Sequence, residues 1–177
     1  MVAIMGDDFF KKSKELFKSG DIKNTIATYE KALSNIDRDK ESKHYITFLK
    51  DILSHCKKNN LREEEALVLR AMGRTYSVFK EYVDSLKHHW LALKIQRKLG
   101  KKIEVAEGLQ FIAEDQEVSG NFDEAIKSYI EAREIFNELG KKDKVSLIET
   151  ELERLEEYSK EALDTEYMLS KFNIDDF

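Results

Sequence analysis

The stretch "LGKK" occurs twice in this chain, at residues 99–102 and again 40 residues later at 139–142. When residues 61–100 are aligned with residues 101–140, small and apolar residues coincide, among them Gly73 with Ala113, Leu86 with Ile126, and Ala92 with Ala132. Self-similarity at a fixed spacing of this size indicates stacked copies of one supersecondary unit. LGKK then marks the boundary between copies, and we expect Leu99 and Leu139 to be the last core residues of their helices.

The composition favours helices. The 177 residues are 41% hydrophobic and 37% charged, with seven glycines and no proline. Glycine and proline are too few for the turns that connect the strands of a sheet, while good helix formers are abundant. The net charge of −5 argues against a general nucleic-acid binder, which needs a basic face. We therefore expect an all-α fold.

Each 40-residue copy divides into two helices. The first helices are "EEALVLRAMGRTYSVF" (64–79) and "VAEGLQFIAEDQEVSG" (105–120), and the second are "YVDSLKHHWLALKIQRKL" (82–99) and "FDEAIKSYIEAREIFNEL" (122–139). Glycines after the helix ends supply the breaks. A third copy, "LFKSGDIKNTIATYEKALSNI" (16–36), has the same turn at Gly20 and an apolar helical stripe behind it.

The segments "SGDIKNTIATYEKAL" (19–33) and "SGNFDEAIKSYIEA" (119–132) resemble the tetratricopeptide repeat. The second helix of that repeat opens Gly-x-aromatic-x-x-Ala and carries an aromatic and then a small residue. Ala125, Tyr129 and Ala132 match this pattern, whereas the middle copy has Ser85 and His89 in the first two places. The repeat-ending proline is absent, and the longer spacing resembles the long-repeat subgroup of Pins-type adaptors and Rap-type bacterial regulators.

The resemblance covers residues 6–36 and 61–140, and it implies one domain over 1–177 folded as a right-handed α-α superhelix. Repeat one is expected at 6–36, repeat two at 61–100, repeat three at 101–140, a capping helix at 142–171 and a tail at 172–177. Residues 40–59 fit no repeat. Their apolar stripe points about 150° away from the stripe of residues 22–36, so we expect a break near 37–41 and an inserted helix.

No residue pattern indicates catalysis. The consecutive His88 and His89 diverge by about 100° on a helix and cannot hold a metal together, and His89 occupies a core position. Cys56, next to His55, lies on an apolar stripe and is interpreted as a buried hydrophobe. We expect no enzyme activity, no cofactor and no metal. With no basic leader and no apolar run of about 18 residues, a cytoplasmic location is expected.

In tetratricopeptide arrays the first helices line the concave face, so the resemblance implies a peptide-binding groove there. By helical phase, the groove residues are Leu67, Arg70, Arg74, Val78, Glu107, Gln110, Glu114, Glu117, Thr150 and Arg154. Arg70 and Arg74 would bind an acidic side chain of an acidic-apolar peptide, with Leu67 and Val78 as apolar anchors. Alternatively, Arg74 and Glu114 pair with each other. On the first helix of the first repeat, the face that corresponds to this groove carries Phe10 and Lys14.

The leading hypothesis is a non-catalytic adaptor that binds a peptide segment of a partner protein, without nucleic acid or membrane. The alternative is a self-assembling structural protein. Its homo-oligomer interface would be made by the acidic-aromatic tail "YMLSKFNIDDF" (167–177) or by the inserted helix. A weaker hypothesis is a regulator of a signalling enzyme or transcription factor, as the long-repeat subgroup suggests.

Overall fold

The computed structural model describes the backbone of residues 2–36 and 41–172 and the side chains of residues 6–36, 41–158 and 160. Within these residues the chain is all α-helical, which confirms the expected fold class. The helices are α1 (Val2–Lys18), α2 (Ile22–Leu33), α3 (Ser42–Lys58), α4 (Arg62–Val78), α5 (Tyr82–Lys98), α6 (Lys102–Val118), α7 (Phe122–Glu138) and α8 (Lys142–Phe172). The expected tail, from residue 173 on, and the core of the expected break, residues 37–40, lie outside the described residues.

The helices begin at intervals of 20 residues, from residue 2 to residue 142. Six turns of the described chain share one backbone feature, a residue with positive φ two positions after the last residue of the helix. Gly20, Gly100, Gly120 and Gly140 fill this place, and Asn60 and Lys80 fill it in the other two turns. Because an L side chain is strained at positive φ, glycine is the usual residue there. This explains the glycine of each LGKK.

Leu99 and Leu139, which precede two of these glycines, are C-cap residues rather than core residues. Leu99 is 41% exposed, and Leu139 is partly exposed. The expectation that both end the hydrophobic stripe is therefore wrong. The last buried residues of their helices lie earlier, at Gln96 and Phe136.

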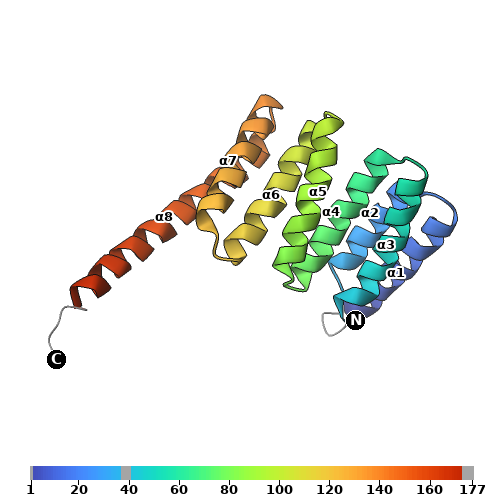
Figure 1. Cartoon of the computed structure of the whole chain (residues 1–177), viewed down its shortest axis with the longest axis horizontal. Coiled ribbons are helices and arrows are strands. Elements are labelled where there is room, and N and C mark those ends of the chain that lie inside the picture. Colours follow the sequence, from blue (N-terminus) through green and yellow to red (C-terminus); the bar gives the residue numbers. More distant parts are fainter. Residues whose placement is uncertain (1, 37–40, 173–177) are drawn as a thin grey trace.

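Neighbouring helices pack as antiparallel hairpins that stand side by side in a row (Figure 1). The most extensive pairings are α4 with α5, α6 with α7, and α1 with α2. Between hairpins, α2 packs on α4, α5 on α6, and α7 on α8, whose C-terminal part extends beyond the row (Figure 1).

The core consists of two large clusters joined by a small one. One cluster unites apolar residues of α1 to α4, the other those of α5 to α8, and a small group from α4 and α5 lies between them. On α8, Ile148, Leu152 and Leu155 are buried against α7, so this part of the helix covers the end of the row. An end helix of this kind removes an apolar surface that would otherwise face water.

The helix expected at 40–59 is α3, and it packs against α1 and α4. The ring of Phe10 on α1 lies 5.0 Å from that of Tyr45 and 5.5 Å from that of Phe48, measured between centroids. Phe10 is only 5% exposed. The face of α1 that was expected to continue the groove, with Phe10 and Lys14, is thus partly covered by α3.

Candidate functional site

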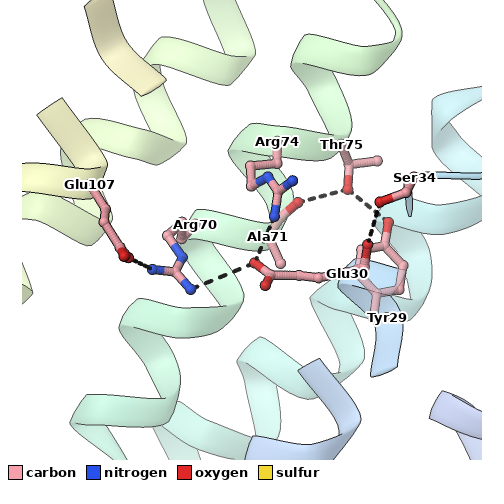
Figure 2. Close-up of polar contacts among 8 residues, drawn as sticks. All are labelled: Tyr29, Glu30, Ser34, Arg70, Ala71, Arg74, Thr75 and Glu107. Carbon is pink, nitrogen blue, oxygen red and sulfur yellow. Dashed lines mark hydrogen bonds and ion pairs between the residues drawn. The ribbon is translucent and has the colours of Figure 1, made fainter. Parts of the chain in front are cut away.

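Three predicted groove residues of α4 (Arg70, Arg74 and Val78) lie on a surface that α4, α6 and α8 share, but both arginines already have partners. Nη1 of Arg70 lies 3.0 Å from Oε2 of Glu107 on α6, and Nη2 lies 3.7 Å from Oε1 of Glu30 on α2. Figure 2 shows the guanidinium of Arg70 between the two carboxylates. Its side chain is 15% exposed, so this bridge between three helices is partly shielded from water.

Arg74, one turn further along α4, shares Glu30 with Arg70. Nη1 of Arg74 lies 3.3 Å from Oε1 of Glu30, and its guanidinium lies 5.1 Å from the centre of the Phe111 ring. The arginine faces a carboxylate and an aromatic ring, a favourable environment for a cation. Neither arginine is therefore free for an acidic ligand. The alternative pairing expected for Arg74, with Glu114, is replaced by the pairing with Glu30.

A buried polar cluster lies behind this surface, where α4, α5 and α6 meet. Asp115 on α6 accepts hydrogen bonds from two serine hydroxyls, that of Ser77 at 2.6 Å and that of Ser85. Burial raises the pKa of Asp115, while the two serine hydrogen bonds oppose that rise. The hydroxyl of Ser85 also lies 2.8 Å from the carbonyl oxygen of Gly73, which joins α5 closely to α4.

His89 completes the cluster and is 1% exposed. Its Nε2 lies 3.9 Å from Oδ2 of Asp115, and its ring stacks on Phe111 with the centroids 5.6 Å apart. Burial, reinforced by the positive charges of Arg74 and Arg70, lowers the pKa of His89 to about 3. The imidazole is therefore neutral at pH 7. Its Nδ1 is buried without a hydrogen-bond partner among the residues that the structure describes.

Serine, histidine and aspartate together raise the question of a nucleophilic triad, but the geometry differs. In a triad the imidazole lies between the hydroxyl and the carboxylate and accepts the hydroxyl proton. Here Ser85 donates directly to Asp115, and the imidazole of His89 lies beyond hydrogen-bond distance of the carboxylate. The cluster is a hydrogen-bonded link between α4, α5 and α6 and lacks the order of contacts of a triad.

Two cavities open on the shared surface, and Glu114 lines both. The α4–α6 cavity, of about 190 Å³, is lined by Arg74, Ser77, Val78, His89, Phe111, Glu114 and Asp115. The α6–α8 cavity, of about 380 Å³, is lined by Gln110, Glu114, Glu117, Val118, Tyr129, Leu147, Glu151 and Arg154. Together they form a continuous strip across α4, α6 and α8, which we call the α4–α6–α8 surface.

Unlike Glu107, Glu117 and Glu151, Glu114 forms no ion pair with a described residue. Its side chain is exposed, and the residues that line the two cavities displace part of the water around it. This desolvation, together with the charge of Asp115, raises the pKa of Glu114 to about 6, although Arg74 opposes the rise. By contrast, Glu117 and Glu151 are both paired with Arg154, at 2.8 Å and 2.7 Å.

The structure brings most of the predicted groove residues together. Arg74, Val78, Gln110, Glu114, Glu117 and Arg154 line the two cavities, and Arg70 and Glu107 adjoin them as an ion pair. Two predicted residues serve other purposes. Leu67 packs against the core cluster of α1 to α4, and the hydroxyl of Thr150 donates to the carbonyl oxygen of Ser146 on its own helix.

Sequence reasoning missed Glu30, Phe111 and Asp115. A signal for Asp115 was present, because Ser85 and His89 stand where the next copy has Ala125 and Tyr129. Two polar residues at core positions require a buried polar partner, and the adjoining helix supplies Asp115. Glu30 gave no such signal, since its pairing depends on how α2 is placed against α4.

A third cavity, of about 750 Å³, lies between α1 and α3. It is lined by Lys14, Phe17, Lys18, Glu41, Lys43, His44, Thr47, Phe48 and Asp51. The two phenylalanines stand edge to face, with centroids 5.9 Å apart. The hollow thus combines an apolar wall with three lysines and two carboxylates.

Cys56 on α3 is fully buried, as expected for a small hydrophobe. Burial raises the pKa of its thiol to about 11, which keeps the thiol protonated. Among the described residues, no group of three or more His, Cys, Asp or Glu side chains is arranged to hold a metal ion. Nor does any described helix combine the length and the apolar character that crossing a bilayer requires.

Comparison with known proteins identifies structural neighbours but no family. No protein-family model matches the chain, and no curated protein matches it in sequence. The crystal structure of BtubC (BKLC) from P. vanneervenii is similar, with a TM-score of 0.73 and 15% sequence identity. The match covers 92% of this chain and 66% of that one, so this chain spans just under two thirds of its neighbour's length. At this identity the likeness concerns the fold.

Proposed function

We propose that this chain is a tetratricopeptide-like, non-catalytic adaptor that binds a peptide segment of a partner protein on the α4–α6–α8 surface. A superhelical array of this type presents its first helices, here α4 and α6, on the concave side. The repeat resemblance supports this arrangement. A surface built on rigid packed helices is pre-formed, so binding costs little conformational entropy.

The observation that carries the proposal is the apolar exposure beside the cavities. Val118 is 63% exposed and Leu147 is 59% exposed, and both line the α6–α8 cavity together with Tyr129. A concave site with apolar walls and a few polar groups is the usual form of a binding site. Exposed apolar side chains that gather around one hollow indicate a surface that another molecule covers.

A selection experiment tests this proposal. Peptides of about 12 residues are selected from a random phage-displayed library on the full chain, and the enriched sequences are measured by isothermal titration calorimetry. We expect Kd values on the order of micromolar. The variant Leu147→Glu should weaken binding at least about tenfold, a loss of about 1.4 kcal/mol.

The matched control is Val83→Glu, which introduces the same charge at an α5 residue that is 84% exposed and lines neither cavity. It should bind like the parent. The proposal fails if no peptide is enriched, or if the two variants bind the enriched peptides equally well.

The α1–α3 cavity favours a second candidate function, self-assembly. Phe17 and Phe48 offer an apolar wall, and Lys14, Lys18 and Lys43 offer positive charge. This chemistry complements an acidic-aromatic segment such as residues 167–177 of a second copy. Analytical ultracentrifugation of the full chain should then give a mass above the monomer. Truncation after Ser170, or Lys43→Glu, should restore the monomer, and a monomeric full chain would rule this candidate out.

A further inference from the structure

We propose that the α4–α6 cavity is a pocket for a lysine or arginine side chain of the bound peptide, with Glu114 as the counter-charge. This inference rests on the proposed function and specifies the chemistry of its partner. It also reverses the acidic-apolar partner that the sequence suggested, because Arg70 and Arg74 are already paired with Glu30 and Glu107.

The charge balance of the α4–α6–α8 surface favours a cation. The carboxylates that line it or pair with its arginines are Glu30, Glu107, Glu114, Asp115, Glu117 and Glu151, against the three arginines Arg70, Arg74 and Arg154. Each arginine is held by at least one of these carboxylates, whereas Glu114 has no ion-pair partner among the described residues. A ligand ammonium or guanidinium would supply the missing partner.

The unpartnered nitrogen of His89 points to the same kind of ligand. Nε2 of His89 lies on the side of Asp115, so the neutral tautomer with its proton on Nε2 is favoured. In this tautomer Nδ1 is a hydrogen-bond acceptor. A buried acceptor without a donor is costly, and a ligand N–H group would satisfy it. His89 and Glu114 line the same cavity, so one cationic head group can serve both.

The size of the cavity suits a single side chain. Its volume is about 190 Å³, which corresponds to about six groups of the size of a water molecule. Val78 lines the cavity for the aliphatic stem of a lysine or arginine. Arg74 also lines it, but its guanidinium is held by Glu30 and by the Phe111 ring. A cation that leaves water for this site also lowers the energy of ionised Glu114, so binding and ionisation of Glu114 support each other.

The test uses small analogues of single residues on the full, ¹⁵N-labelled chain. Nα-acetyl-lysine N-methylamide is titrated while the amide signals of Ser77, Phe111 and Glu114 are followed by NMR. The norleucine and glutamate counterparts serve as comparison ligands, because norleucine keeps the stem and lacks the ammonium. We expect saturable shifts for the lysine analogue with a Kd on the order of millimolar, and affinities at least about tenfold weaker for the other two.

Two variants of equal charge change complete the test. Glu114→Gln should weaken binding of the lysine analogue at least about tenfold, whereas Glu104→Gln, on the same helix and lining neither cavity, should leave the affinity within about twofold. The inference is overturned if the lysine analogue produces no shifts up to about 50 mM, if norleucine or glutamate binds equally well, or if Glu114→Gln binds like the parent.

Failure of this inference can be distinguished from failure of the proposed function. If selected peptides lose affinity with Leu147→Glu but are indifferent to Glu114→Gln, the surface binds peptides and the cation pocket does not exist. If no peptide is enriched at all, the adaptor function fails whatever the lysine analogue does.

Discussion

Nη1 of Arg70 lies 3.0 Å from Oε2 of Glu107, and this contact ties α4 to α6. Because Oε1 of Glu30 lies 3.7 Å from the same guanidinium and accepts no hydrogen bond from a described residue, Arg70 also compensates a second carboxylate. The ion pairs of Arg70 are shielded, with 15% of its side chain exposed. An arginine in this position stabilises the packing of the helices, and its charge is already compensated without a ligand.

Replacing Arg70 with methionine should therefore lower the free energy of unfolding by about 1–3 kcal/mol, since Glu107 loses its partner and Glu30 keeps only Arg74. Urea denaturation followed by circular dichroism measures the loss. Arg97→Met is the matched control, because Arg97 and Glu131 form a similar interhelical pair in which both side chains are 47% exposed. That pair should contribute less than about 1 kcal/mol. Equal losses in both variants would contradict the bridging role.

The close approach of α4 and α5 at Gly73 predicts a packing defect on substitution. A Cβ at this position would lie 2.7 Å from Cε1 and from Nε2 of His89, a buried ring that Phe111 holds from one face. Gly73→Ala should lower the unfolding free energy by about 1–3 kcal/mol, and Gly73→Leu by more.

Gly108 on α6 provides the control, because a Cβ there meets Leu93 at 3.4 Å, an ordinary contact. Gly108→Ala should leave the stability unchanged or raise it by up to about 1 kcal/mol through helix propensity. A Gly73→Ala variant as stable as the parent would show that the two helices do not cross as described.

Lys80 has a φ of 61°, and four other turns have glycine at the equivalent position. This left-handed conformation costs an L residue about 1–2 kcal/mol. Lys80→Gly should therefore raise the melting temperature, with a gain of about 0.5–1 kcal/mol after the entropy cost of glycine is subtracted. The reverse change, Gly120→Lys at a φ of 79°, should lose a similar amount. Opposite signs for the two variants are the expected result, and a loss in both would contradict it.

The buried His89 predicts how stability depends on pH. Its pKa is lowered from 6.5 to about 3 in the folded chain. Between about pH 3 and pH 6.5 the unfolded chain therefore binds a proton at His89 that the folded chain does not bind. The unfolding free energy then decreases as the pH falls through this window. The raised pKa values of Asp115 and Glu114 act in the opposite direction, so variants are compared with the parent.

His89→Gln should flatten the profile. We expect the loss of stability between pH 7 and pH 4 to shrink by more than about 1 kcal/mol relative to the parent. His55→Gln serves as the control, because His55 is an exposed residue of α3, and it should keep the profile of the parent. An unchanged slope in His89→Gln would mean that His89 is not held neutral in the folded chain.

The 40-residue repeat predicted the helices well because one feature, a glycine in the turn after a helix, recurs together with the hydrophobic pattern. Gly100, Gly120 and Gly140 marked ends that lie where they were expected. Asn60 and Lys80 make the same turn without glycine, so the glycine positions alone did not predict the 20-residue spacing of all the helices. The placement of α3 over Phe10 also depends on tertiary packing, which the stripe of α3 did not specify.

Helical phase was a good guide to which groove residues share a surface, but not to their charge state. It placed Arg74, Glu114 and Arg154 on the same face of α4, α6 and α8, where they do line the cavities. The pairing of the arginines depends on Glu30, a residue on α2 that belongs to a helix outside that face. A charge on a predicted surface therefore says little about ligand preference until its partners are known.

The position of a selected peptide tests the proposed binding surface most directly. A crystal structure of the full chain with its tightest selected peptide should show the peptide across α4, α6 and α8. A lysine or arginine nitrogen should lie within about 4 Å of the Glu114 carboxylate. A peptide seated on the outer side of α5 and α7, or one that places an acidic side chain on Arg70, would contradict it.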